Sequence, residues 1–150
     1  MADRVQFELV TPERLLLSEM VEMVVVPGTE GNFGVLPGHA PLISSIRPGT
    51  IDIYEEQSVT RRIFVVSGIA EVTPELCTVL ADEAMAPDEV DRSAIEVELQ
   101  NVQGNLPSLR EQVERAAGAE RETLLVELHR LERRENVLQA ELRALGEIAR

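Results

Sequence analysis

Residues 27–41 read PGTEGNFGVLPGHAP, and this stretch decides how the first part of the chain folds. It holds four of the nine glycines and three of the eight prolines. Because glycine tolerates a positive φ and proline fixes φ, this density predicts consecutive tight turns rather than a flexible linker. Short apolar segments lie between the turns, which indicates a surface that is presented to a partner.

The glycine spacing in this stretch superficially resembles a nucleotide-binding loop, but the chemistry does not fit one. A phosphate loop ends in Gly-Lys-Ser/Thr, and the chain contains no lysine. A dinucleotide-binding fingerprint leads directly into a helix, whereas Pro37 and Gly38 follow here. We therefore interpret the stretch as a cluster of turns.

The hydrophobic pattern divides the chain near Pro87. Before this point apolar residues alternate with polar ones, as at Val5, Phe7 and Leu9, which is typical of strands with one buried face. We expect strands near residues 4–10, 13–18, 20–26, 33–36, 42–46, 49–55, 60–66, 69–73 and 76–81. Many short strands at this spacing predict an antiparallel β-sandwich over residues 1–86.

After Pro87 the apolar period becomes that of a helix. Asp88 is the expected N-cap of a helix over about residues 88–103, and GNLP at 104–107 is expected to end it. The capping box SLRE at 108–111 predicts a second helix over about residues 108–148. The predicted fold class is α+β in two parts, with an αα-hairpin over residues 87–150 after the sandwich.

Apolar residues on the second predicted helix repeat at spacings typical of a coiled-coil-like seam. They are Leu124, Leu128, Leu131, Leu138, Leu142, Leu145 and Ile148. A helix of that length would span roughly 60 Å, which exceeds what a shorter partner helix covers. The seam is either satisfied within its own hairpin or offered to another protein when the hairpin opens at residues 86–87 and 104–107.

Composition and charge exclude several classes of protein. A net charge of −13 argues against nucleic-acid binding, which needs a basic surface. The lone Cys77 cannot form an internal disulfide, which indicates a reducing compartment. No signal core or apolar run of about 18 residues is present, so we expect membrane association only through partners and no direct insertion.

No set of residues indicates catalysis or metal binding. His39 and His129 are the only histidines, and neither has a cysteine or carboxylate cluster at metal-ligand spacing. No serine or threonine lies in a nucleophile elbow. We interpret His39, between Gly38 and Ala40, as a turn residue that hydrogen-bonds to local backbone, and we predict a protein with no catalytic residues.

Several segments together resemble the epsilon subunit of F-type ATP synthases, called delta in mitochondria. They are PG at 27–28, GNFGVLPGHAPL at 31–42, RPG at 47–49 with Ile51, VSG at 66–68 with AEV at 70–72, and TVLAD at 78–82. These segments follow the family's order and spacing across residues 5–86. The last third of the chain is similar to the family only in being helical.

The resemblance implies a non-catalytic rotor subunit in the central stalk of a proton-translocating F-type ATP synthase, at the cytoplasmic face of the bacterial inner membrane. It implies that the tip formed by Glu30, Gly31, Asn32 and Phe33 faces the c-ring, and that His39, Ala40 and Pro41 lie toward the gamma subunit. Many bacterial members have an acidic residue at the position of Asn32, so a charged contact with the ring is expected to be absent.

The resemblance also implies that the helices fold against the sandwich or extend into the catalytic head, where they block ATP hydrolysis. In the extended state Arg130, Arg133, Arg134 and Arg143 are expected to meet acidic loops of the beta subunits, in transient contact with alpha and beta. The alternative is that these arginines only balance neighbouring glutamates.

Some members bind ATP through an Ile/Leu-Asp-x-x-Arg-Ala motif at the start of the hairpin. The matching positions, residues 90–95, read VDRSAI, so Asp91 is kept but the motif's arginine falls on Ala94. Arg92 lies at a different helical position and cannot project in the same direction. We expect weak or no ATP binding and no other cofactor.

Two alternative functions place the chain in other classes of protein. One is a free-standing adaptor that homodimerises through the leucine seam, which sedimentation would distinguish from a monomeric rotor subunit. The other, a small-ligand β-barrel, is disfavoured by only four aromatic residues and the lack of a polar pocket set.

Overall fold

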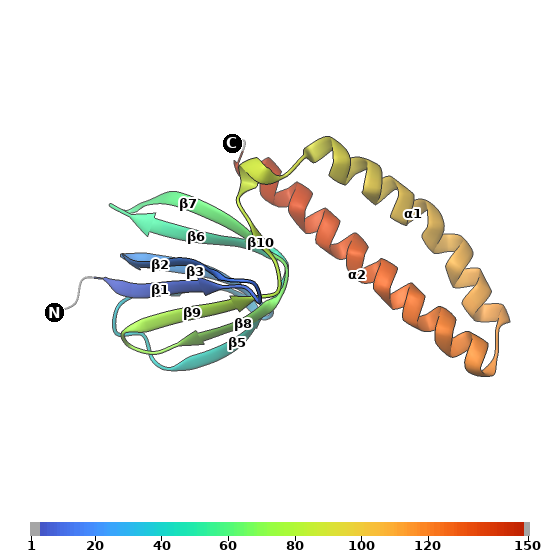
Figure 1. The fold of residues 1–150 in the computed structure, drawn as a ribbon, viewed down its shortest axis with the longest axis horizontal. Coiled ribbons are helices and arrows are strands. Elements are labelled where there is room, and N and C mark those ends of the chain that lie inside the picture. Colours follow the sequence, from blue (N-terminus) through green and yellow to red (C-terminus); the bar gives the residue numbers. More distant parts are fainter. Residues whose placement is uncertain (1–3, 149–150) are drawn as a thin grey trace. The chain divides into compact units, whose positions relative to one another are not determined.

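The chain folds into two compact units, and the division falls between Val90 and Asp91 (Figure 1). The structure is a computed structural model that describes residues 4–148, and side chains as far as residue 146. The sequence predicted the boundary at residues 86–87, a few residues early. The difference arises because Pro87–Glu89 forms a short 3₁₀ helix, η1, that contacts β7 of the first unit.

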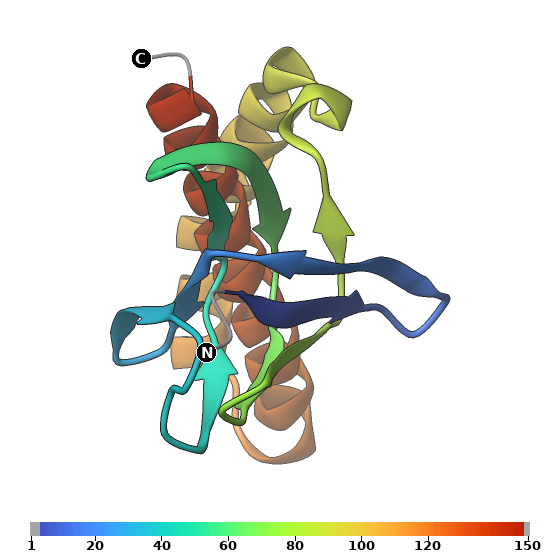
Figure 2. The ribbon, with the colours of Figure 1, turned by 90° about the vertical axis from the view of Figure 1, so that its left-hand side faces the viewer.

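The first unit is a ten-stranded sheet that curls into a sandwich (Figure 2). Its strands are β1 (Val5–Val10), β2 (Leu15–Val21), β3 (Met23–Gly28), β4 (Gly31–Val35), β5 (Leu42–Ile46), β6 (Gly49–Glu55), β7 (Ser58–Val65), β8 (Gly68–Val72), β9 (Leu76–Ala81) and β10 (Ala84–Met85). The nine strands that the sequence predicted are all present. The short β10, which pairs with β7, was missed.

The order of the strands is β10-β7-β6-β3-β5-β8-β9-β1-β2, and β4 also pairs with β3. All of these pairs are antiparallel except β1 with β9, which is parallel. The predicted antiparallel sandwich is therefore confirmed, and the pair of β1 with β9 is its one parallel exception among the described strands. Turn signals predict hairpins, which are antiparallel, but β1 and β9 are distant in sequence and no hairpin sets their direction.

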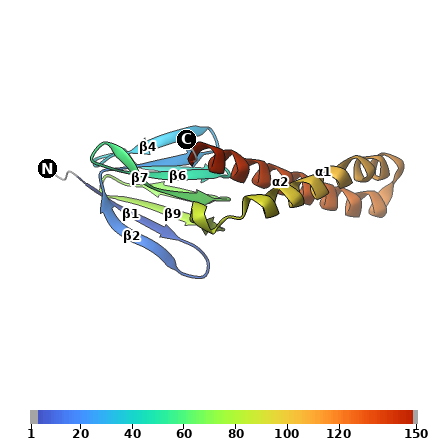
Figure 3. The same cartoon turned by 90° about the horizontal axis from the view of Figure 1, so that it is seen from above.

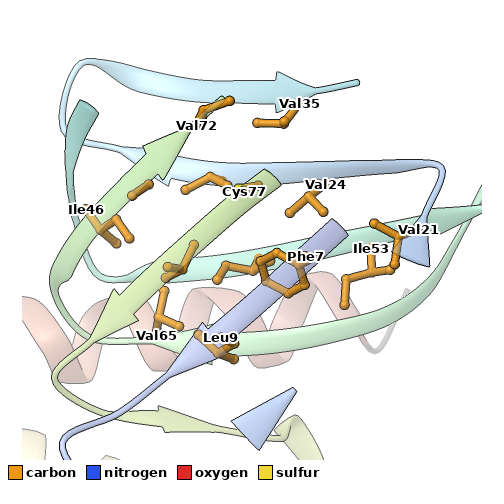
Figure 4. Close-up of a cluster of buried hydrophobic side chains, with 14 of the residues drawn as sticks. Phe7, Leu9, Val21, Val24, Val35, Ile46, Ile53, Val65, Val72 and Cys77 are labelled. Carbon is orange, nitrogen blue, oxygen red and sulfur yellow. The ribbon is translucent and has the colours of Figure 1, made fainter. Parts of the chain in front are cut away.

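Alternation along the strands builds the core of the sandwich, because every second side chain points inward. The side chains of Phe7 and Leu9 from β1 lie among Ile53 from β6 and Val65 from β7 (Figure 4), and all four are almost completely buried. Cys77 is buried in the same cluster, and burial raises the pKa of its thiol to about 12. The thiol is therefore protonated and unreactive at neutral pH.

The second unit is a hairpin of two helices, α1 (Arg92–Arg115) and α2 (Gly118–Ile148), which run side by side (Figure 3). The hairpin was predicted correctly, but its helix limits were not. Asp91, rather than Asp88, caps α1, and its side chain accepts a hydrogen bond from the Ala94 N–H at 3.3 Å. The helix then continues through GNLP, so Pro107 and the expected capping box at Ser108 lie in its interior.

Packing explains why α1 does not end at Pro107. Its buried residues are Ile95, Val102, Leu106, Leu109 and Val113, which recur at helical spacing on both sides of the proline. Burying Leu106 and Leu109 on one stripe offsets the hydrogen bond that Pro107 cannot donate. The chain instead turns at residues 116–117, and Gly118 takes a left-handed φ of 63° at the start of α2.

The observed lengths correct one argument from the sequence. With 24 residues α1 spans about 36 Å, and with 31 residues α2 spans about 46 Å. The first helix therefore covers most of the second, and the large excess of uncovered helix that the sequence predicted does not exist. Along α2 the predicted seam residues Leu128 and Leu138 are buried, and Leu124, Leu131, Leu142 and Leu145 are partly buried. The side chain of Ile148 lies outside the described residues.

Candidate partner interfaces

The tip of the β3–β4 hairpin is a tight turn exposed to solvent. Gly28 pairs with Gly31 across it, so that only Thr29 and Glu30 form the loop. Gly31 has a φ of 133°, which favours glycine, and Glu30, Gly31 and Asn32 are exposed. A Cβ on Gly28 would lie 3.0 Å from the Phe33 ring, so the glycine lets this ring pack over the backbone.

A loop outside the hairpin holds this tip in place. The Arg47 guanidinium donates a hydrogen bond to the Asn32 side-chain oxygen, and the Arg47 backbone N–H bonds to the Pro27 carbonyl at 3.0 Å. The Thr29 N–H bonds to the Ser45 carbonyl at 3.0 Å. These three hydrogen bonds brace the tip, and within it the Asn32 side-chain oxygen accepts the hydrogen bond from the Arg47 guanidinium.

The segment His39–Pro41 follows a turn at Gly38, whose φ is 82°. His39 Nδ1 donates a hydrogen bond to the Ala40 carbonyl at 2.6 Å, and the His39 N–H bonds to the Leu36 carbonyl at 3.2 Å. The interpretation of His39 as a turn residue that bonds to local backbone is therefore confirmed. The segment precedes β5, whereas the hairpin tip bonds near the far end of β5, so these candidates lie about 16 Å apart along the strand.

A third surface was not predicted from the sequence. On the solvent side of the sandwich, Leu80 of β9 pairs with Ile69 of β8 and with Val10 of β1, and Val10 pairs with Leu15 of β2. Residues paired in this way present their side chains on the same face of the sheet. Ile43 of β5 lies on that face too, because it is two residues along the strand from Ser45, which pairs with Ile69.

We call these five residues (Val10, Leu15, Ile43, Ile69 and Leu80) the outer apolar face. Leu15, Ile43, Ile69 and Leu80 have exposed fractions of 56%, 73%, 49% and 51%. An apolar row across five neighbouring strands is typical of a protein–protein contact. Strand alternation placed each of these residues on the outer side, but only the pairing register puts them next to one another, so no local signal reveals the surface.

The four arginines predicted to act in an extended tail all lie on α2, in two different settings. Arg133 and Arg143 are exposed. Arg130 forms a bidentate pair with Glu127 three residues earlier in the same helix, at 2.6 and 3.0 Å, which raises the pKa of Arg130 and lowers that of Glu127. Arg143 lies more than two helical turns beyond the other three, so the four do not form one cluster.

Arg134 makes a contact between the two helices. Its Nε and Nη2 donate to the two carboxylate oxygens of Glu98 on α1, at 2.7 and 2.9 Å. The hydrogen bond from Arg134 holds the pKa of Glu98 below its usual value of 4.5. This pair was not predicted, because the wrong limits of the first helix left the facing residues undefined.

The residues that match the ATP-binding motif have structural contacts of their own. The Asp91 carboxylate caps α1 through the Ala94 N–H, and Arg92 pairs with Glu96 one turn later, at 3.2 Å. Within residues 4–148 we find no group of three or more His, Cys, Asp or Glu that could hold a metal ion. Neither α1 nor α2, as far as each is described, is long and apolar enough to cross a membrane.

A curled sandwich with a rigid tip and an exposed apolar face, followed by a helical hairpin, defines a protein that works by contact with other proteins. Residues 4–87 match the model of the ATP synthase delta/epsilon chain β-sandwich domain. The chain is 52% identical to the ATP synthase epsilon chain of Rhodospirillum rubrum over 120 residues, which cover 80% of this chain and 90% of that relative. The epsilon chain of Rhodospirillum centenum is 51% identical over 122 residues, covering 78% and 84%.

Solved structures show the same fold at low sequence identity. A chain in the Euglena gracilis mitochondrial ATP synthase (OSCP/F1/c-ring, rotational state 1) has a TM-score of 0.73 at 19% identity, and the match covers 97% of this chain and 83% of that one. A chain in the central stalk/c-ring structure of the Tetrahymena thermophila mitochondrial ATP synthase has a TM-score of 0.56 at 13% identity, covering 94% and 96%.

The chain belongs to the ATP synthase delta/epsilon chain family. The resemblance noted in its turn cluster and its later segments is therefore confirmed. As a member of this family, the chain is an accessory subunit of the enzyme and not a catalytic one.

Proposed function

We propose that this chain is a central-stalk subunit of a proton-translocating F-type ATP synthase, working at the cytoplasmic face of the bacterial inner membrane. Its sandwich joins the gamma subunit to the c-ring, and its helices restrain ATP hydrolysis. Family membership carries the proposal, together with fold neighbours described as part of F1/c-ring and central stalk/c-ring assemblies. No observation favours the free-standing adaptor over this function.

The sandwich offers different surfaces to the two partners. The rigid tip at Glu30, Gly31, Asn32 and Phe33 contacts the c-ring. The segment at His39, Ala40 and Pro41 contacts gamma, and the adjoining outer apolar face extends this contact. Covering exposed apolar side chains contributes roughly 25 cal/mol for each Å² removed from water, which makes this face the main source of affinity for gamma.

The helices supply the restraint on hydrolysis. In an extended state the arginines of α2 meet acidic loops of the beta subunits. Arg133 and Arg143 are already exposed, Arg134 is released from Glu98 when the helices separate, and Arg130 remains beside Glu127 on the same helix. Such contacts are long-range and electrostatic, so raising the salt concentration should weaken the restraint.

The deciding experiment measures ATP hydrolysis by a catalytic head stripped of this subunit, to which either the full chain or residues 1–90 are added back. The core of the sandwich lies wholly within residues 5–81, so the shorter chain keeps its core. We expect both to bind and only the full chain to suppress hydrolysis. If residues 1–90 suppress hydrolysis as well, the helices are not needed for inhibition. If both chains bind and neither suppresses hydrolysis, the subunit couples gamma to the c-ring but does not inhibit.

We also propose that the chain binds ATP weakly or not at all. The motif's arginine is replaced by Ala94, while Asp91 and Arg92 are engaged in capping α1 and in pairing with Glu96. Titration calorimetry should give no saturable heat, and a dissociation constant in the low micromolar range would overturn the proposal.

A further inference from the structure

Two charged side chains from different helices of the hairpin form a fork-to-fork contact. The guanidinium of Arg134 on α2 donates two hydrogen bonds to the carboxylate of Glu98 on α1, at 2.7 and 2.9 Å. This bidentate geometry is the strongest form of arginine–carboxylate pairing, and it requires both helices to be in register. The contact therefore exists only while the hairpin is closed.

We propose that the Glu98–Arg134 pair is a latch that controls the release of the inhibitory tail. This inference rests on the proposed function, in which the extended helix inhibits hydrolysis. Arg134 cannot pair with Glu98 and with an acidic loop of a beta subunit at the same time. The same guanidinium thus stabilises the closed hairpin in one state and the inhibited complex in the other.

Two ion pairs that lie within single helices do not have this property. Glu127 and Arg130 are three residues apart on α2, and Arg92 and Glu96 are four apart on α1. A pair within one helix persists whether the hairpin is open or closed, so it favours neither state. Glu98 and Arg134 are 36 residues apart and join the two helices, which makes their pair sensitive to opening.

The Glu98–Arg134 pair is weak enough for the hairpin to open reversibly. The Glu98 and Arg134 side chains have exposed fractions of 44% and 39%, so solvent screens their attraction. A partly exposed pair of this kind shifts an equilibrium by about two- to fivefold. Burial of the apolar stripe of α1 provides most of the free energy that keeps the hairpin closed. The Glu98–Arg134 pair adjusts the equilibrium between the closed and open hairpin, which binding to a partner has to shift.

Thiol labelling of the full chain measures this equilibrium directly. Val102 on α1 is 6% exposed, so a cysteine placed there by Val102→Cys reacts only when the hairpin opens. Cys77, fully buried in the sandwich, is the internal reference. We expect Glu98→Gln to speed labelling at residue 102 about two- to fivefold and to leave Cys77 unchanged, because only the pair between helices is lost.

The matched control is Glu127→Gln, which removes the same charge and also breaks a bidentate arginine pair, but within α2. It should leave the labelling rate at residue 102 unchanged. The swapped variant Glu98→Arg with Arg134→Glu should restore slow labelling. Equal rates for Glu98→Gln and wild type overturn the latch, as does failure of the swapped variant to slow labelling when circular dichroism shows intact helices.

Hydrolysis assays on the same variants distinguish the latch from the proposed inhibition of ATP hydrolysis by the tail. If Glu98→Gln opens the hairpin and strengthens inhibition of the catalytic head, both ideas are supported. If it opens the hairpin without affecting hydrolysis, the latch stands and the inhibitory function of the tail is overturned. Unchanged labelling overturns the latch whatever the hydrolysis rate does.

Discussion

The guanidinium of Arg47 bonds to the side-chain oxygen of Asn32, and so connects the loop before β6 to the exposed tip of the β3–β4 hairpin. Gly49 makes room for this contact. A Cβ at that position would lie 2.9 Å from Arg47 Nη1 and 3.0 Å from the Pro27 Cβ. The tip therefore depends on a side chain and a glycine that lie outside its own hairpin.

Replacing this arginine should affect a contact more than it affects folding. We expect Arg47→Ala to weaken binding of the chain to isolated c-ring several-fold, since the tip loses its brace, while the free energy of unfolding falls by about 1 kcal/mol or less. Arg61→Ala, which removes an exposed pair with Glu19 at 3.4 Å, is the control. Ring affinity equal to that of wild type would show that the brace does not matter for the contact.

A charge on the outer apolar face should weaken binding to gamma. Leu80 and Ile69 are about half exposed and pair across β9 and β8, so Leu80→Glu or Ile69→Glu places a carboxylate at the centre of this face without disturbing the core. We expect at least a tenfold loss of affinity for gamma in a pull-down or titration. Val126→Glu adds the same charge at a 71% exposed position on α2 and should have no effect. Equal affinities for all three variants would exclude this face.

Gly68 is a position where any side chain should damage the sandwich. Its φ is 149°, and a Cβ there would lie 1.9 Å from the Leu80 carbonyl oxygen. Because that atom is backbone in a neighbouring strand, we expect Gly68→Ala to lower the free energy of unfolding by about 3 kcal/mol or more in urea titration. In Gly34→Ala the new Cβ meets only the Met23 sulfur at 3.5 Å, so a much smaller change is expected. Similar losses for both variants would contradict this explanation.

The first helix contains two residues that weaken it. Pro107 lies in the interior of α1, and a Cβ on the exposed Gly104 would meet no atom within 4 Å. Relative to alanine, proline in a helix interior costs about 3 kcal/mol and glycine about 1 kcal/mol. Both Pro107→Ala and Gly104→Ala should raise the melting temperature of the helical signal, the proline change by more. A lower melting temperature for Pro107→Ala would mean that the proline is needed for packing.

The contribution of the latch should depend on pH in one direction. The hydrogen bond from Arg134 lowers the pKa of Glu98 below 4.5, so the pair stabilises the closed hairpin above that pH and loses its effect as pH falls through the lowered pKa. Wild type and Glu98→Gln should therefore differ in melting temperature at pH 7, and the difference should shrink as the pH falls below 4.5 and through the lowered pKa. A difference that does not shrink on acidification would show that the carboxylate charge is not responsible.

Local pattern was sufficient to determine the elements. Alternation at Val5, Phe7 and Leu9 predicted β1, and the same pattern predicted the other long strands. A strand with one buried face has an apolar residue at every second position, so the signal is contained in a few neighbouring residues. The turn cluster likewise placed His39 in a turn that bonds to its own backbone. The order of motifs across residues 5–86 identified the family, which the match over residues 4–87 confirms.

What the sequence could not determine were the contacts between distant segments. Pro107 reads as a helix breaker, yet burial of Leu106 and Leu109 carries α1 through it. The parallel pairing of β1 with β9 and the row of apolar residues on the outer face depend on register between strands far apart in the chain. The same is true of Glu98 with Arg134 and of Arg47 with Asn32.

The physical reason is the range of the forces involved. The sequence by itself determined the two-part fold, its strands and its family, because propensity and alternation act over a few neighbouring residues. Only the tertiary structure decided where the helices end, which apolar residues form a surface and which charges meet. Those outcomes depend on packing free energy summed over contacts that are distant in sequence, and packing outweighs local propensity where the two conflict.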